Sequence, residues 1–301
     1  MKPPSTNSPD ARTDILGQLA PGSRVAVIRL RSLGDCVLTT PALQLLKTAR
    51  PDLETAVVVE DRFAAIFDNP LPPSIRALRG FRPDLCLNLH GGTRSARLTA
   101  LSGAKFRAGF DIFKPSLIYN VPIPTAQQVL GITRRVHTAE HMAAAVFHLG
   151  VPVTEVPRAH IKAAPAQHQK PYAVIHPVAA TPEKTWPAAA FAELAPRLPF
   201  QPVFIAGPAD DLTPFQQWQT IIGAPLPELA SLMQGASLFI GNDSGPAHMA
   251  AAFGIPQVVI FGPSDAEIWA PWRTEARVIK AAGPISSVTV NQVMHAVEQL
   301  L

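Results

Sequence analysis

The feature that most constrains the fold is a repeated alternation of short apolar runs with helical patterns. In the first half, four apolar runs end at glycine, proline or polar residues, and a helical pattern closes the series. They are Val25–Leu30, Ala56–Glu60, Leu85–Leu89, a weaker run at 105–110, and the helix over Thr138–Leu149. Buried strands that alternate with helices predict βα units and mostly parallel sheets.

The alternation is interrupted once and then starts again. Val151–Lys170 contains three prolines and has little periodicity, which is typical of an interdomain connection. The apolar runs beyond it are Ala173–His176, Val203–Ala206, Leu238–Gly241 and Gln257–Phe261. An amphipathic helix over 287–301 ends the chain, and it either caps its own domain or crosses back to the first.

These patterns predict an α/β protein with two Rossmann-like domains. A chain of 301 residues suits two domains of about 150 residues each. We place the first domain at 23–160, a linker at 161–171 and the second domain at 172–301. Ligands of such folds bind beyond the carboxyl ends of the strands, so the chemistry is expected in the loops that follow them.

The first residues and the cysteines indicate the compartment. The opening MKPPSTNSPDARTD is polar and has no apolar segment behind its charges, so 1–22 is predicted to be a disordered leader rather than a secretory signal. No long apolar stretch predicts a membrane span. Cys36 and Cys86 lack the spacing of a metal site. A reduced, cytoplasmic protein is the simplest interpretation.

Charge is distributed unevenly between the halves. Residues 1–160 carry a net charge of +7 and residues 161–301 a net charge of −3, within a total of +4. Fifteen of the basic residues in the first half are arginines, which bind phosphate and carboxylate groups in a bidentate manner. Either this is ordinary surface charge or the first domain binds an anionic partner. Nucleic acid is disfavoured, because no nucleic-acid-binding motif accompanies the arginines.

The first βα turn reads RLRSLGD and places a single carboxylate, Asp35, beside a helix N-terminus. A dinucleotide fingerprint needs three glycines here, and Gly34 stands alone, which argues against a dehydrogenase. Asp35 is either a general base for an attacking hydroxyl or a residue that only caps the helix.

The most informative segment, LFIGNDSGPAH, runs from a strand into a polar turn and a helix that Pro246 suits. The backbone at Ser244 and Gly245 predicts an anion site for a diphosphate, with His248 within reach on the first helical turn. The alternative is an ordinary capped helix with a satisfied histidine. Asp243 would repel a diphosphate, so a hydroxyl of the ribose or sugar, or its own backbone, is its expected partner.

Two further strand ends carry charged candidates. Lys184, in HPVAATPEKTWP, is either the countercharge of a departing diphosphate or a solvated lysine. Asp210, in GPAD, either holds a ribose hydroxyl or belongs to a turn.

Taken together, RLRSLGDCVLTTPAL, LHGGTRSARL, HPVAATPEKTWP, IAGPADD and FIGNDSGPAHMAAAFGIPQVVIFGPSD resemble glycosyltransferase family 9. This family contains the ADP-heptose:lipopolysaccharide heptosyltransferases. The resemblance runs from about Arg24 to the last strands. It implies a GT-B fold, in which two Rossmann-like domains face each other across a cleft and the second binds the nucleotide-sugar. It also implies an inverting transfer that needs neither a metal nor a cofactor.

The resemblance assigns a role to individual residues. Asp35 matches the catalytic base, and Ser32, Gly34 and Arg94 match acceptor-binding positions. The donor-binding positions are Thr181, Lys184, Asp210, Asp243, Ser244, Gly245 and His248. Acceptors in the family are anionic, lipid-linked core sugars, which fits the basic first half and a peripheral contact with the cytoplasmic face of the inner membrane.

The sequence also departs from the family pattern. Val178 stands where the family has glycine, and Ala180 stands where it has a hydroxyl residue, for which Thr181 is the candidate substitute. The function implied by the resemblance is transfer of heptose from ADP-heptose to a lipopolysaccharide inner-core acceptor. The departures leave two alternatives open: transfer from another nucleotide-sugar, and a protein that binds a nucleotide-sugar without turnover.

Overall fold

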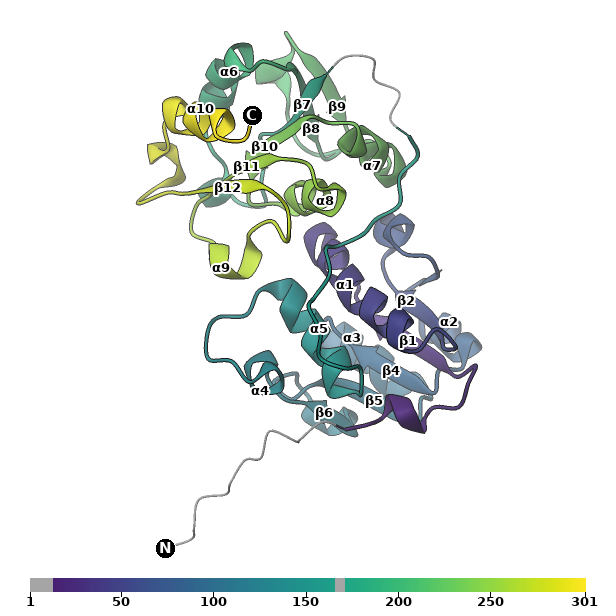
Figure 1. Ribbon diagram of the computed structural model, residues 1–301. Helices are drawn as coiled ribbons and strands as arrows, with labels where there is room; N and C mark the ends of the chain where they lie inside the picture. Colours follow the sequence, from purple (N-terminus) through teal and green to yellow (C-terminus); the bar gives the residue numbers. More distant parts are fainter. Residues whose placement is uncertain (1–12, 166–170) are drawn as a thin grey trace, which may run out of the picture. The chain divides into compact units, whose positions relative to one another are not determined.

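A computed structural model describes residues 13–165 and 171–301 (Figure 1). The chain divides into two compact units. The first holds the chain up to Arg31 together with Pro41–Pro157, and the second holds Ser32–Thr40 together with Arg158–Leu301. Residues 1–12 of the expected leader and 166–170 of the expected linker lie outside the described residues.

The first unit is built around a six-stranded sheet in the order β3-β2-β1-β4-β5-β6, and every neighbouring pair is parallel. Its strands are β1 (Arg24–Ile28), β2 (Glu54–Val58), β3 (Pro70–Leu71), β4 (Leu85–Asn88), β5 (Phe106–Phe110) and β6 (Val121–Ile123). The helices that accompany them are α1 (Leu33–Ala49), α2 (Ile75–Phe81), α3 (Thr93–Leu101), α4 (Ala126–Leu130) and α5 (Thr138–His148), and α1 begins within the segment that belongs to the second unit.

The second unit holds a sheet of the same size, in the order β12-β11-β10-β7-β8-β9, and again every neighbouring pair is parallel. Its strands are β7 (Tyr172–His176), β8 (Gln201–Ala206), β9 (Gln219–Ile222), β10 (Leu238–Asn242), β11 (Gln257–Phe261) and β12 (Ala276–Lys280). The helices are α6 (Ala188–Leu194), α7 (Leu226–Gln234), α8 (Gly245–Phe253), α9 (Ala266–Trp269) and α10 (Val290–Glu298).

The two sheets share one topology. Counting strands from the start of each unit, both follow the order 3-2-1-4-5-6, which is that of the Rossmann fold. The order reverses between β1 and β4 in the first sheet and between β7 and β10 in the second. The prediction of two Rossmann-like domains with parallel sheets is confirmed, and these two switch points are where such folds bind ligands.

The central strands form where the sequence is apolar on both faces. All five residues of β7, β10 and β11 are buried, as expected of strands covered on both sides. The strands that the apolar runs did not predict are β3, β6, β9 and β12. Of these, β9 and β12 are only partly buried edge strands, and β3 has two residues, so they lack a continuous apolar run.

The last helix, α10, remains with its own unit. Val290, Val293 and Val297 are buried in the same apolar cluster as Trp186 and Ile260, which lies on β11. This decides between the two placements that the sequence left open, in favour of the helix that caps its own domain.

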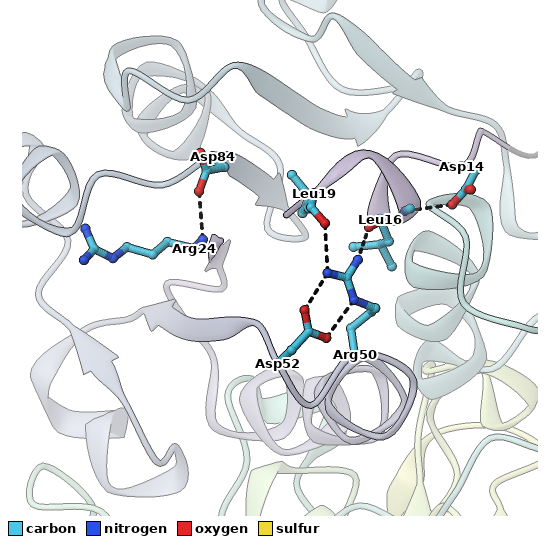
Figure 2. A network of polar contacts seen from close by, with 8 residues as sticks. Asp14, Leu16, Leu19, Arg24, Arg50, Asp52 and Asp84 are labelled. Carbon is cyan, nitrogen blue, oxygen red and sulfur yellow. Dashed lines mark hydrogen bonds and ion pairs between the residues drawn. The ribbon is translucent and has the colours of Figure 1, made fainter. Parts of the chain in front are cut away.

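Part of the expected leader is packed against the first unit. Leu16 and Leu19 are buried, and Thr13 N donates to His148 O over 3.0 Å. Arg50 holds the segment, because its guanidinium donates to the carbonyls of Leu16 and Leu19 while Asp52 accepts two further bonds from it (Figure 2). Residues 13–22 are therefore ordered, in contrast to the disorder expected from their polar, proline-rich start.

Candidate functional site

The switch point of the second sheet brings together two segments that lie far apart in the sequence. His176 is the last residue of β7, and Asn242 is the last residue of the neighbouring β10. The strands pair in parallel, with Gly241 opposite His176. The loop after β7 and the turn from β10 into α8 consequently start at the same edge of the sheet.

Three consecutive residues of the β10–α8 turn each bind one residue of the β7 segment. Asn242 Oδ1 accepts a hydrogen bond from the backbone N–H of Trp186 over 2.9 Å. Asp243 Oδ2 lies 3.0 Å from Lys184 Nζ. Ser244 Oγ lies 3.0 Å from His176 Nδ1. We call Asn242–Ser244 with these three partners the paired turn; its bonds fix the turn and the loop as one body.

The ion pair between Lys184 and Asp243 gives Asp243 a role that the sequence did not indicate. The Asp243 side chain is only 8% exposed and that of Lys184 is 34% exposed. A buried carboxylate is costly unless it is paired, and Lys184 supplies the charge. The ammonium group is thereby held at the carboxyl edge of the sheet, next to the start of α8.

His176 was not among the residues that the sequence singled out as site residues. Burial lowers the pKa of His176 to about 4, although the negative charge of Asp210 acts in the opposite direction. The imidazole is therefore neutral at physiological pH. Ser244 Oγ also lies 3.1 Å from Asn242 O and can donate to it, so a tautomer of His176 protonated on Nδ1 completes the chain of bonds. A histidine at the last position of an otherwise apolar strand is the signal that could have revealed it.

The N-terminus of α8 is shaped by Ser244 and Gly245. Ser244 takes the N-cap position with an extended backbone, and its side chain makes no capping bond to the helix. Its hydroxyl is engaged by the paired turn instead. A helix N-terminus is positively polarised and binds anions. His248, on the first turn, is buried with 4% of its surface exposed, and its ring lies 6.5 Å from that of Trp269.

The two other donor-binding candidates are engaged in local turns. Asp210 Oδ2 accepts the backbone N–H of Gly207 over 2.8 Å, which is the turn role left open by the sequence. Thr181 precedes the short 3-10 helix Pro182–Lys184, and its carbonyl accepts from Lys184 N and from Thr185 Oγ1. Thr181 thus shapes the loop that carries Lys184.

Ser32, Gly34 and Asp35 form the start of α1 and belong to the second unit. Asp35 Oδ2 accepts from Ser32 Oγ over 3.0 Å and lies 3.4 Å from Ser32 N. The carboxylate thus makes a capping interaction and remains partly exposed. Within the same unit, a Cβ placed on Gly34 would lie 2.6 Å from His248 Cδ2, so a side chain at this position would displace the histidine.

The remaining acceptor candidate, Arg94, lies on the first turn of α3 in the first unit. Its guanidinium is 3.1 Å from Glu60 Oε1, and Arg62 binds the same carboxylate over 2.9 Å. Burial acts to raise the pKa of Glu60. The hydrogen bond from Arg62 and the charges of the surrounding arginines nevertheless hold that pKa below its usual value. One carboxylate is therefore shared by two arginines, whose exposed side chains retain a positive surplus.

Neither a metal cluster nor a membrane helix is found in the part of the chain that the structure describes. Over residues 13–165 and 171–301, no group of three or more histidine, cysteine, aspartate or glutamate side chains is placed to hold a metal ion. Within the same ranges, no helix has the length and apolar character needed to cross a bilayer. Cys36 and Cys86 are buried free thiols.

Comparison with known proteins decides the family. The sequence pattern of glycosyltransferase family 9 (heptosyltransferase) matches residues 74–293, which is more than half of the chain. The chain belongs to glycosyltransferase family 9. The matched range contains Arg94 and all the donor-binding candidates, whereas Asp35 precedes it.

Relatives and solved structures agree with this assignment to the heptosyltransferase-like glycosyltransferases. Lipopolysaccharide heptosyltransferase 3 of Escherichia coli is 26% identical over 295 residues, which cover 81% of this chain and 84% of the relative. A family 9 glycosyltransferase structure from Veillonella parvula has a TM-score of 0.80 at 23% identity and covers 97% of this chain and 99% of its own. E. coli heptosyltransferase WaaC, solved with ADP, has a TM-score of 0.76 at 21% identity, with 92% and 100% covered. Its fold and that of E. coli heptosyltransferase II are GT-B, and this chain has the same fold.

Proposed function

We propose that this glycosyltransferase moves heptose from ADP-heptose to an inner-core acceptor of lipopolysaccharide, with inversion at the anomeric carbon and without a metal ion. The observation that carries the proposal is the paired turn, which holds a lysine ammonium beside the N-terminus of α8 at a Rossmann switch point. A diphosphate is the group that such a pair of positive centres suits.

The proposed donor site assigns one task to each part of the turn. The diphosphate binds at the N-terminus of α8, where Gly245 allows close approach of the backbone. Lys184 neutralises the charge that builds up as the nucleoside diphosphate leaves, which is the task that a metal ion performs in other enzymes. Asp243 keeps the ammonium in place, and His176 orients the Ser244 hydroxyl. Asp210 and His248 complete the donor side.

The chemical step is a single displacement. Asp35 accepts the proton of an acceptor hydroxyl, the oxygen forms a bond to the anomeric carbon, and the bond from that carbon to the diphosphate breaks. Attack on the face opposite the leaving group inverts the configuration. The contact of Gly34 with His248 supports this assignment, because it places the residue before Asp35 against the first turn of α8.

The proposed acceptor-binding residues are Arg94 in the first unit and Ser32 and Gly34 in the second. The positive surplus around Glu60 favours a phosphorylated or acidic saccharide. The E. coli relative is named for its action on lipopolysaccharide, which supports an acceptor of this class.

The decisive experiment compares donors. Binding of ADP, UDP and GDP is measured by calorimetry, followed by transfer from ADP-heptose to a heptose-deficient core saccharide with product stereochemistry read by NMR. We expect a preference for ADP, an inverted product, and activity retained in the presence of a chelator. A preference for UDP or GDP would replace ADP-heptose by another donor, and tight ADP binding without transfer would indicate a nucleotide-sugar-binding protein.

A further inference from the structure

A loop on the first unit presents apolar side chains to solvent in an ordered conformation. It connects β5 to β6 and spans residues 111–118, and we call it the 111–118 loop. Leu117 is 97% exposed, the largest exposed fraction of any large apolar side chain among the described residues, and Ile112 is 59% exposed. Two such side chains on one loop make it a candidate interaction site.

The exposure of these side chains results from how the loop is anchored. Phe113 turns inward, where its ring meets that of Phe110 edge-on at 5.6 Å and lies 6.4 Å from that of Tyr119. Tyr119 is buried, and its hydroxyl accepts from Asn88 Nδ2 over 2.8 Å. Arg107 Nε donates to Ile118 O over 2.9 Å. The loop is thus fixed from within, which leaves Ile112 and Leu117 on its outer side.

Basic side chains accompany the exposed apolar ones. Residues 105–118 contain Lys105, Arg107 and Lys114 against a single acidic residue, Asp111. Lys114 is exposed within the loop, and Lys105 extends over the ring of Phe106. Positive charge beside a few inserted apolar side chains is the combination that binds anionic lipid surfaces.

The size of the patch separates a bilayer from a protein partner. A stable protein–protein interface buries about 800 Å² on each partner, and two exposed aliphatic side chains supply only a part of that. A bilayer interface instead accepts individual apolar side chains while flanking lysines extend to the headgroups. From this geometry we propose that the 111–118 loop docks the protein on an anionic lipid surface by inserting Ile112 and Leu117.

The loop also lies beside the proposed acceptor site. A Cβ placed on Gly91 would lie 3.0 Å from the Phe113 ring, so the turn that leads into α3 and Arg94 packs directly against the loop anchor. Docking through this loop presents a lipid-linked saccharide to the same edge of the first sheet. This consequence rests on the proposed function, whereas lipid binding itself requires neither donor nor acceptor.

The test measures binding of the whole chain to vesicles by co-sedimentation. The vesicles contain phosphatidylcholine alone or mixed with phosphatidylglycerol, and the variant is the double substitution Ile112→Ser/Leu117→Ser. We expect wild type to bind the mixed vesicles. The variant should bind them at least about tenfold more weakly, because it lacks the two aliphatic side chains that insert into the bilayer. The matched control is Val153→Ser/Ile222→Ser, which removes two other exposed aliphatic side chains (46% and 50% exposed) and should bind as wild type does.

The outcomes separate the alternatives. Equal sedimentation of wild type and the Ile112/Leu117 variant overturns the proposal. The proposal is also overturned if wild type binds neither kind of vesicle but forms a dimer in light scattering that the variant does not form. The loop would then bind a second copy of the chain. Transfer to a delipidated, water-soluble acceptor should be unchanged in the variant, and transfer to a vesicle-embedded acceptor should fall. If wild type transfers heptose to neither acceptor, the proposed function is refuted, and the measured binding to vesicles still decides the proposal about the loop.

Discussion

The two switch points share a topology but differ in how their polar groups are held. In the second unit, the paired turn is almost enclosed: Asn242 is fully buried, and the side chain of Asp243 is 8% exposed. In the first unit, the side chains of Arg62 and Arg94 are 64% and 58% exposed around one carboxylate. The same backbone order thus supports a buried, hydrogen-bonded polar site in one unit and an exposed cluster of charges in the other.

This difference suits two kinds of ligand. The ligand proposed for the second unit is a compact diphosphate, and a preorganised turn would bind it with little loss of side-chain freedom. The proposed acceptor, a branched and phosphorylated saccharide, varies in shape, and exposed arginine side chains retain the rotamer freedom to follow it. We therefore expect substitutions in the paired turn to act on donor binding and those of the arginines around Glu60 to act on acceptor binding, while Asp35 acts on the chemical step alone.

The largest expected effect belongs to Asp35→Asn. Asparagine retains an acceptor for the Ser32 hydroxyl but has no basic group, so kcat should fall by about 10²–10⁴-fold, the usual contribution of a general base. The affinity for ADP should stay within about twofold, since the substitution leaves the proposed diphosphate-binding residues unchanged. Steady-state kinetics and calorimetry measure the two quantities. A wild-type kcat in the Asp35→Asn variant would remove Asp35 from the mechanism.

The next effect compares one histidine in each unit, the half-buried His141 and the buried His176. Burial lowers the pKa of His141, which stacks on Phe110 in the first unit, to about 4, as it does for His176 in the second. The unfolded chain binds these protons near pH 6.5 and the folded chain only near pH 4. The free energy of unfolding is therefore highest with respect to these two groups above pH 6.5. It declines as the pH falls from 6.5 to 4, by on the order of 3 kcal/mol for each histidine.

Calorimetric unfolding between pH 7 and pH 4 checks this expectation. His141→Phe preserves the stacked ring and His176→Asn preserves a polar atom at the place of Nδ1, so each should flatten part of the decline. His295→Asn is the control, since His295 is exposed on α10. A wild-type protein whose stability does not change over this range would show that neither histidine is kept neutral by the fold.

Much of this arrangement follows from the sequence, and the missing parts have a common physical cause. The central strands and the loops after them were predictable, because a strand buried on both faces must be apolar throughout. The partners of the turn were not. Asn242 reaches Trp186 and Asp243 reaches Lys184 across 56 and 59 residues of sequence, and such contacts exist only once the two strands pair. From local patterns we expected Asp243 to bind a hydroxyl of the ribose or sugar, or its own backbone, and not Lys184.

The same reasoning explains the packed segment at 13–22. The sequence predicted a disordered leader here, yet Ile15, Leu16 and Leu19 are buried. Arg50, which directly follows α1 in the sequence, supplies hydrogen bonds that hold the 13–22 segment (Figure 2). When a segment is held in place by a side chain from elsewhere in the chain, its own sequence gives little indication that it is ordered.

A third prediction tests the buried half of the comparison. Lys184→Met removes the ammonium, leaves the Asp243 carboxylate beside the proposed diphosphate site, and should weaken ADP binding by about 30-fold, because a charge-assisted contact is replaced by repulsion. Acceptor KM should change little. Arg197→Met is the control, since Arg197 also pairs with a carboxylate, that of Glu193 at 3.6 Å, on the surface of the same unit. Equal ADP affinity in wild type and the Lys184 variant would assign the lysine to structure rather than to the donor.

The smallest expected effect lies in the exposed half. Arg94→Ala should raise acceptor KM by about fivefold and leave ADP affinity unchanged, because an exposed arginine contributes a single screened contact. The effect should shrink as salt is added, since the Debye length falls from about 10 Å at 0.1 M to about 3 Å at 1 M. Arg97→Ala, one turn further along the same helix, is the matched control. If both variants raise acceptor KM equally, the first unit attracts its acceptor through its net charge and not through a specific contact of Arg94. The two units would then differ more strongly, because the second binds its ligand through defined contacts and the first through long-range attraction.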